Sequence, residues 1–349
     1  MNPLRTLLLS ATVLGASVAA GQAAPDVVAS VKPVHSLVAA VMKGVGEPAL
    51  IVEGAGSPHT YSLKPSQARR LQDADIVFWI GHELEAFLEK PIETIGDKAT
   101  AVELVDAHGL VKLPLREGGA FEAHEHHDGA HGEAEHAGHD HEGHDHAEHD
   151  HDDDHEKAGE KHAHEAEGDG HEHGHGEFDA HVWLDPENAK AMIHEIEETL
   201  SAADPDNANA YADNAAAAIA GIDALTAEVG TILAPVRGKG YVVFHDAYQY
   251  FEKRFDIPAA GSITVSPEVM PGAERVSEIR ARIGELGAAC VFAEPQFEPK
   301  LISVVIEGTA AKSGILDPLG SSLKDGPDLY AELIRGMATS LRDCLADAS

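Results

Sequence analysis

Eight short runs of apolar, mostly β-branched residues recur along this chain, with helical patterns between them. Four lie in its first part and four in its last part, at 26–31, 49–54, 75–81, 100–106, 241–246, 258–265, 289–295 and 314–318. Their near-continuous apolar character is typical of strands buried on both faces. Strands that alternate with helices form parallel sheets. We therefore predict an α/β fold with two lobes, each a mainly parallel sheet flanked by helices.

An alanine-rich stretch, 204–235, separates the two sets of strands. Alanine favours helix, and about 28 helical residues would extend roughly 42 Å at ~1.5 Å per residue. A helix of that length can bridge the two lobes; the alternative is two shorter helices broken near Gly221. The predicted boundaries are an N-terminal lobe at 24–203, the linking helix at 204–235 and a C-terminal lobe at 236–349.

The tract at 116–177 has a different composition. It contains seventeen of the 24 histidines, and from 117 onward it has 21 acidic residues and two lysines. With almost no apolar side chains it cannot offset its chain entropy, so we expect a disordered insertion in the N-terminal lobe. Imidazoles at two- and three-residue spacing suit Zn²⁺, Cu²⁺ and Ni²⁺, which predicts several weak metal sites.

The chain as a whole carries a formal net charge of -35, and the tract contributes more than half of it. Such acidity argues against nucleic acid and anionic membranes as partners, because both are themselves negatively charged. It also attracts cations, which agrees with a metal-binding role for the tract.

The first 23 residues have a basic residue, a short apolar stretch and a small-residue cleavage pattern, which predicts a secretory signal peptide. No cysteine follows the cleavage site, so we expect no lipid anchor there. We identify no later run that approaches the ~20 apolar residues of a membrane-spanning helix. An exported, soluble protein is expected, and its two cysteines, Cys290 and Cys344, then suggest one disulfide; the alternative is two buried free thiols.

Three histidines outside the tract stand where a ligand site between two lobes would need them. His59 follows an apolar run in the loop before a helix, His245 ends the run at 241–246, and His181 precedes an Asp-Pro helix start. Open α/β sheets bind ligands at the carboxyl ends of their strands. Taken together, these positions predict a site built from loops of both lobes.

The ordered motifs of the chain resemble one family. They are SPHTYSLKPSQARRLQDADIVFWIG, the histidine tract, DAHVWLDP, GKGYVVFHDAYQYFEKRFDI, PGAERVSEIR, CVFAEPQFEP and LDPLG. In this order they are similar to the zinc-binding periplasmic component of a bacterial ABC importer, the ZnuA type. The resemblance implies two α/β lobes joined by a rigid helix, with one metal ion in the cleft between them.

The resemblance also implies the ligands. Carried over onto the matching motifs, His59, His181 and His245 are the three nitrogen ligands of Zn²⁺. Some members have a glutamate just before the first histidine, but Pro58 stands here. The fourth position then falls to Asp317, which matches a carboxylate ligand of manganese-type relatives, or to water; the alternative role for Asp317 is that of a turn acceptor.

Three imidazoles with at most one carboxylate form a borderline-soft, near-tetrahedral site, which suits Zn²⁺. The second nitrogen of each histidine usually donates to a carbonyl or carboxylate, and Asp179 and Asp246 are nearby in sequence. Glu294, at the end of the run at 289–295, is a further candidate for a supporting role.

The function implied is capture of Zn²⁺ in the periplasm and delivery to an inner-membrane ABC permease, without enzymatic activity. We expect a monomer that does not insert into the membrane. Three alternatives stay open: a manganese-type capture protein, a zinc-dependent hydrolase, since three histidines and water are also a catalytic arrangement, and a periplasmic metal buffer or chaperone in which only the tract binds metal.

Overall fold

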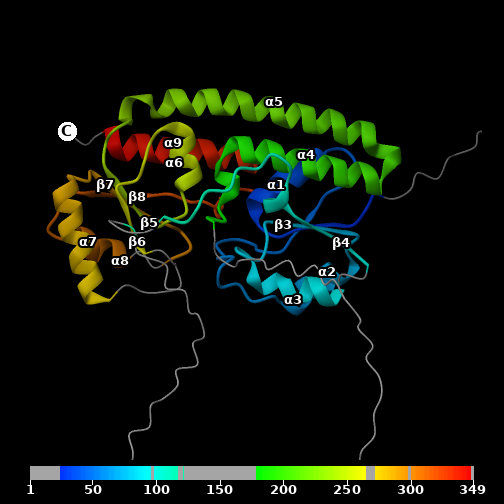
Figure 1. The fold of residues 1–349 in the computed structure, drawn as a ribbon, viewed down its shortest axis with the longest axis horizontal. Helices are drawn as coiled ribbons and strands as arrows, with labels where there is room; N and C mark the ends of the chain where they lie inside the picture. Colours follow the sequence, from blue (N-terminus) through cyan, green and yellow to red (C-terminus); the bar gives the residue numbers. More distant parts are fainter. Residues whose placement is uncertain are drawn as a thin grey trace, which may run out of the picture. The chain divides into compact units, whose positions relative to one another are not determined.

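The computed structural model describes residues 24–95, 98–116, 121, 178–264, 272–297 and 300–346. The predicted signal peptide and the tract, apart from Arg116 and Phe121, lie outside the described residues. Within the described part, all eight predicted strands are present, and helices lie between them (Figure 1).

The first sheet is a four-stranded parallel sheet in the order β2-β1-β3-β4. Helices α1, α2 and α3 connect its strands along the chain. The elements are β1 (Val27–Ala29), α1 (Lys32–Val41), β2 (Ala49–Leu50), α2 (Pro65–Asp73), β3 (Ile76–Trp79), α3 (Ala86–Ile95) and β4 (Thr100–Glu103).

The second sheet repeats this topology in the order β6-β5-β7-β8, again with every neighbouring pair parallel. The elements are β5 (Tyr241–His245), α6 (Gln249–Phe255), β6 (Gly261–Thr264), α7 (Ala273–Leu286), β7 (Cys290–Ala293), α8 (Lys300–Ile306) and β8 (Lys312–Ile315). In each sheet the second strand along the chain lies on one side of the first strand, and the third and fourth strands lie on the other side. The carboxyl ends of β1 and β3, and of β5 and β7, therefore form the positions where α/β sheets bind ligands.

Three inner strands, β1, β3 and β5, are buried along their whole length, which explains their apolar sequences. The fourth inner strand, β7, is buried except at its last residue, Ala293, which is partly exposed. The edge strands β4 and β8 are exposed at several positions. Parallel strands covered by helices on both faces account for this pattern.

Three helices complete the described fold: α4 (Pro186–Ala203), α5 (Ala208–Leu233) and α9 (Leu329–Ala346). The long helix α5 lies beside α1, α4 and α9 and also contacts α6 (Figure 1). It runs through Gly221 without a break, so the alternative of two shorter helices is wrong. One hydrophobic core contains residues of both sheets and of these helices, for example Val38, Val229, Tyr241 and Leu341.

The helical stretch Pro205–Val236 is the one segment among the described residues that is long and apolar enough, by length and composition, to cross a membrane. The sequence prediction that no later run approaches that length was wrong on this point. The apolar average comes largely from alanine, and one face of α5 packs into the core through Tyr211, Ile222 and Val229. Its outward-facing carboxylates pair with other helices: Asp223 with Lys190 and Glu228 with Arg335.

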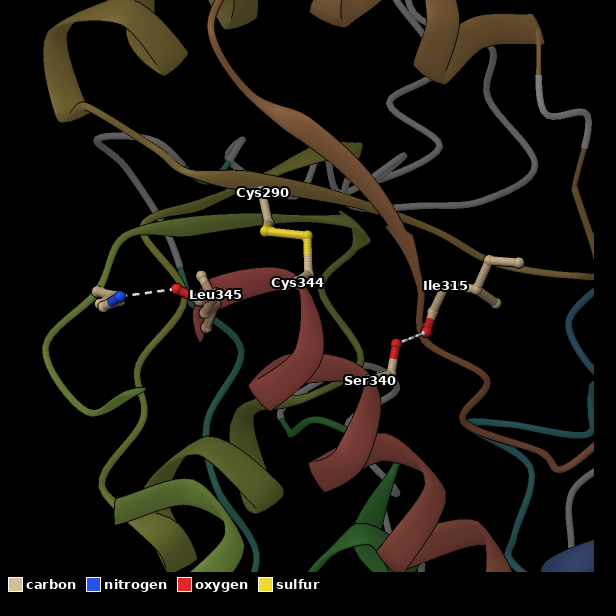
Figure 2. Close-up of a disulfide and its surroundings, with 6 residues drawn as sticks. Cys290, Ile315, Ser340, Cys344 and Leu345 are labelled. Carbon is tan, nitrogen blue, oxygen red and sulfur yellow. Dashed lines mark hydrogen bonds between the residues drawn. A yellow bond between two sulfur atoms is a disulfide. The ribbon is translucent and has the colours of Figure 1, made fainter. Parts of the chain in front are cut away.

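The predicted disulfide is present between Cys290 on β7 and Cys344 on α9 (Figure 2). It attaches the last helix to an inner strand of the second sheet. Two further contacts hold the same end of α9: the Ser340 hydroxyl donates to the Ile315 carbonyl, and Lys239 donates to the Leu345 carbonyl at 2.8 Å.

Candidate metal centre

The three predicted histidines converge on one point. His59 lies in the loop after β2, His181 directly precedes a short 3-10 helix (Val182–Leu184), and His245 is the last residue of β5. The Nε2 atom of His181 is 3.3 Å from the Nε2 atoms of both His59 and His245. Among the described residues, these three form the one group of potential metal ligands, with ligand atoms within 4.8 Å of one another.

Buried carboxylates hold two of these rings from behind. The Nδ1 atom of His181 is 2.7 Å from Asp179 Oδ1, and the Nδ1 atom of His245 is 2.6 Å from Glu294 Oε1. A carboxylate at neutral pH only accepts, so each Nδ1 carries the proton and each Nε2 presents a lone pair. Glu294 follows β7, and His245 ends β5, so this pair sits where the order of the second sheet reverses.

The Nε2 separations fit a bound cation. The Nε2 lone pairs of His181 and His245, whose Nδ1 atoms carry the protons, are 3.3 Å apart and repel unless a positive charge lies between them. A tetrahedral zinc ion with ~2.0–2.1 Å bonds to nitrogen would separate two ligand nitrogens by about 3.3–3.4 Å. The arrangement can therefore accept Zn²⁺ with little movement of the rings.

The protonation equilibria of the rings differ. Burial, together with the positive potential of His181 and His245, lowers the pKa of His59 well below its usual value of 6.5. Burial also acts to lower the pKa of His245, but the charge of Glu294 and its hydrogen bond outweigh that effect and raise the pKa. Without a metal, acidification therefore protonates His245 before His59.

Mostly apolar side chains enclose the site. The small cavity beside the histidines is lined by Ser57, Pro58, Trp183, Glu294, Gln296, Phe297, Pro318 and Leu319 together with the three ligand candidates. Trp183 is fully buried, and its indole N–H donates to the Pro318 carbonyl at 2.8 Å. The lining excludes most water, which strengthens electrostatic interactions inside the site.

Asp317 stands beside the site but does not belong to the histidine cluster. Its Oδ1 accepts from the backbone N–H groups of Leu319 and Gly320, and its Oδ2 accepts from the backbone and hydroxyl of Ser321. Its Oδ1 also accepts from the Gln296 side chain at 3.0 Å. These are the contacts of a turn acceptor, the alternative role that the sequence left open.

The residues that flank the tract meet next to the site. Pro114 and Phe178 form an antiparallel bridge, and the Asp179 N–H donates to the Leu113 carbonyl at 2.8 Å. The Tyr250 hydroxyl accepts from the Leu113 N–H at 2.9 Å and donates to the Asp179 carbonyl at 2.7 Å. The segment that carries Asp179 is thus attached to α6.

Arg116, the first residue of the range that we assigned to the tract, makes two ion pairs with the second lobe. Its Nε and Nη2 atoms bond to the Asp246 carboxylate, and its Nη1 is 2.6 Å from Glu252 Oε2. Asp246, which the sequence suggested as a partner for a histidine, is therefore occupied by arginine. The sequence around Asp246 could not indicate this ion pair, because Arg116 is 130 residues away.

The family comparison agrees with the resemblance read from the motifs. Residues 27–344 match the family model of ZnuA, the periplasmic component A of a zinc-uptake complex. The chain is 53% identical over 350 residues to the high-affinity zinc uptake system protein ZnuA of Brucella suis, covering 99% of this chain and all of that protein.

A more distant relative supports the same assignment, and a solved structure has the same fold. The high-affinity zinc uptake system protein ZnuA of Paracoccus denitrificans is 42% identical over 341 residues, covering 97% of this chain and 98% of that one. A crystal structure of ZnuA matches with a TM-score of 0.67 and 21% identity, over 92% of this chain and 98% of that one. At that identity the structural match speaks for the fold.

Proposed function

Because the chain belongs to the ZnuA family of periplasmic zinc-uptake components, we propose that it captures Zn²⁺ in the periplasm and delivers it to an inner-membrane ABC permease. His59, His181 and His245 bind the ion through Nε2. The protein acts as a monomer, and the signal peptide at 1–23 directs its export.

The observation that carries this proposal is the convergence of three imidazole rings, with the Nε2 atom of His181 at 3.3 Å, a zinc-like spacing, from each of the other two Nε2 atoms. Two of the rings are fixed in the ligating tautomer by Asp179 and Glu294. Histidines that served only in packing would not need to point their acceptor nitrogens at one another. Imidazole is a ligand that Zn²⁺ favours, whereas a manganese site would be expected to use more carboxylate.

The proposed role includes no chemical step. A zinc hydrolase needs a free general base close to the zinc-bound water. The carboxylates nearest the rings, Asp179 and Glu294, already accept the Nδ1 protons of His181 and His245. Purified zinc-loaded protein should therefore not hydrolyse activated esters faster than the same protein with the three histidines replaced.

Zinc titration in competition with a chelator tests the site directly. The mature chain should bind one Zn²⁺ tightly and several weakly. The triple variant His59→Ala/His181→Ala/His245→Ala should lose the tight class only. The exposed histidines His108 and His194 provide a matched control, since their replacement by alanine should leave the tight class intact. A triple variant that still binds one ion as tightly would overturn the proposal.

A deletion separates the site from the tract. Removal of 122–177 keeps Arg116 and its ion pairs, so the ordered ends of the tract are preserved. We expect this variant to retain the tight ion and to lose the weak ones. If it loses the tight ion as well, the alternative of a buffer in which only the tract binds metal gains support.

Competition between Zn²⁺ and Mn²⁺ addresses the cargo. The three-histidine site should prefer Zn²⁺, and Mn²⁺ should not displace it even in large excess. Cells that depend on this protein should fail to grow under zinc chelation when the triple histidine variant replaces it, and added zinc should restore growth.

A further inference from the structure

The side-chain amide of Gln296 lies at the cavity beside the three histidines and has one unused polar atom. Gln296 follows Glu294 by two residues and lines the same cavity. Its Oε1 atom is buried and accepts no hydrogen bond from any described residue. A buried amide oxygen without a hydrogen-bond donor costs free energy of folding. Its presence beside a metal site suggests that a species bound in the cavity supplies the missing donor.

The orientation of this amide is determined by Asp317. The Gln296 Nε2 atom donates to Asp317 Oδ1 at 3.0 Å, and an ionised carboxylate cannot donate in return. The amide therefore cannot flip without placing oxygen against oxygen. Asp317 is itself held by backbone N–H groups of the following turn, including those of Gly320 and Ser321. The turn thus fixes which end of the amide is left unpaired.

The cavity, with no ion in it, has room for one small species. Its volume is about 10 Å³, close to the least that holds one water molecule. Three imidazoles leave one position of a tetrahedral zinc ion open, and in such sites water commonly fills it. A zinc-bound water is a strong hydrogen-bond donor and needs an acceptor within the cavity.

Two other buried polar atoms at the cavity lack a partner among the described residues, Glu294 Oε2 and Ser57 Oγ. The Glu294 carboxylate stands behind the His245 ring, because its other oxygen contacts Nδ1 and the metal would bind at Nε2. The Ser57 hydroxyl can both donate and accept, so it does not distinguish a water from an anion. The fixed amide oxygen of Gln296 does.

We infer that Gln296 is a positioning residue for the fourth coordination position, where its Oε1 accepts a hydrogen bond from the water bound to the metal. This inference rests on the proposed zinc function. A neutral oxygen lone pair at that place favours a water, which can donate, over an anion, which cannot. The same turn that withdraws Asp317 from the metal thereby supplies a neutral acceptor instead of a negative ligand.

Cobalt(II) provides a spectroscopic test in the full mature chain, because its visible d–d bands report the ligands of a tetrahedral site. Subtracting the spectrum of the triple histidine variant removes the contribution of the tract. Gln296→Leu and Gln296→Ala both delete the acceptor, and Ser57→Ala is the matched control in the same cavity. Unfolding of the metal-free variants verifies that each one folds.

Both Gln296 variants should bind Zn²⁺ about 10- to 100-fold more weakly than the parent, the usual loss when a supporting partner of a metal site is removed. Their cobalt spectra should differ from that of the parent. Azide should perturb the spectra of the variants at about tenfold lower concentration than in the parent, because a tenfold change corresponds to nearly the largest net contribution of one hydrogen bond. Ser57→Ala should leave the azide response unchanged, because a hydroxyl that can both donate and accept favours neither a water nor an anion.

The outcomes separate the inference from the proposed function. If the triple histidine variant keeps the tight ion, the three-histidine site itself is wrong. If the triple variant loses it, but folded Gln296 variants match the parent in affinity, spectrum and azide response, the site stands and the role of Gln296 is overturned. An azide response that changes in Ser57→Ala and not in the Gln296 variants also overturns it.

Discussion

Breaking the Cys290–Cys344 disulfide should destabilise the metal-free protein by an amount that follows from the length of the loop it closes. The two cysteines are 54 residues apart in sequence. The chain-entropy relation gives about 4 kcal/mol for a loop of this length at 25 °C. At ~2 °C per kcal/mol for a body of this size, the midpoint of thermal unfolding should fall by about 8 °C.

The bond should act on the second lobe in particular. It joins an inner strand, β7, to the end of α9 (Figure 2). Helix α9 packs against α5 and α1 as well as β8. The carboxyl end of β7 leads to Glu294, which holds the His245 ring. Loss of the bond should therefore weaken the anchoring of α9 first, and zinc affinity should change much less than stability.

Reductant serves as the internal control, since replacing two buried sulfurs also changes packing. The parent should be unfolded, reduced and refolded in the presence of reductant, then compared with Cys290→Ala/Cys344→Ala. The parent should lose about 8 °C on reduction, and the variant should show no response to reductant. Equal midpoints for the oxidised and reduced parent would refute the entropic reasoning, whatever the double variant shows.

Three further predictions concern buried charge. Burial raises the pKa of Glu85 in the folded chain to about 7, above its unfolded value near 4.5. The protonated side chain therefore contributes its full stability below the unfolded pKa, and that contribution is lost as pH rises through 7. In urea unfolding, the free energy of unfolding of Glu85→Gln should exceed that of the parent by about 3 kcal/mol at pH 8 and equal it near pH 4. Arg116→Ala leaves two buried carboxylates unpaired and should lower the free energy of unfolding by about 3–5 kcal/mol. Lys190→Ala breaks pairs with exposed partners and should lower it by less than ~1 kcal/mol. Similar losses for the two variants would contradict this prediction. Glu294→Gln should weaken zinc binding about 10-fold or more, and because Glu294 raises the pKa of His245, chelator competition should show a smaller loss of affinity between pH 8 and pH 6 than in the parent.

The fold could be predicted because its signals are local. Each inner strand is a run of buried residues such as Tyr241–His245, and burial on both faces leaves an unbroken apolar sequence. The long helix was predicted from its alanine content, because helix propensity is a property of each residue. The sequence argument missed the length and apolar average of this helix because it looked for a continuous apolar run, whereas here alanine raises the mean hydropathy of a helix that buries only one face, through residues such as Leu225.

The site shows where local signals end. The three histidines were found because each follows or precedes a recognisable element, and the topology brings those element ends together. The partners of the supporting carboxylates could not be predicted in the same way. Asp179 and Asp246 each stand next to a candidate histidine, yet Asp179 bonds to His181 while Asp246 pairs with Arg116.

The two carboxylates differ in whether their donor is close in sequence or comes from a distant segment of the chain. Asp179 is two residues from His181 and bonds to both its backbone N–H and its ring, a local turn that needs no distant partner. Asp246 lies where the segment before the tract crosses the second lobe, and a guanidinium that can bond to two oxygens at once is a stronger partner than one imidazole nitrogen. That crossing depends on the packing of Leu113 and Pro114 against α6, through Tyr250 and Gln249. A carboxylate that is close in sequence to a ligand histidine is therefore predicted to hold its ring only when a local turn, formed by the residues between them, makes the contact.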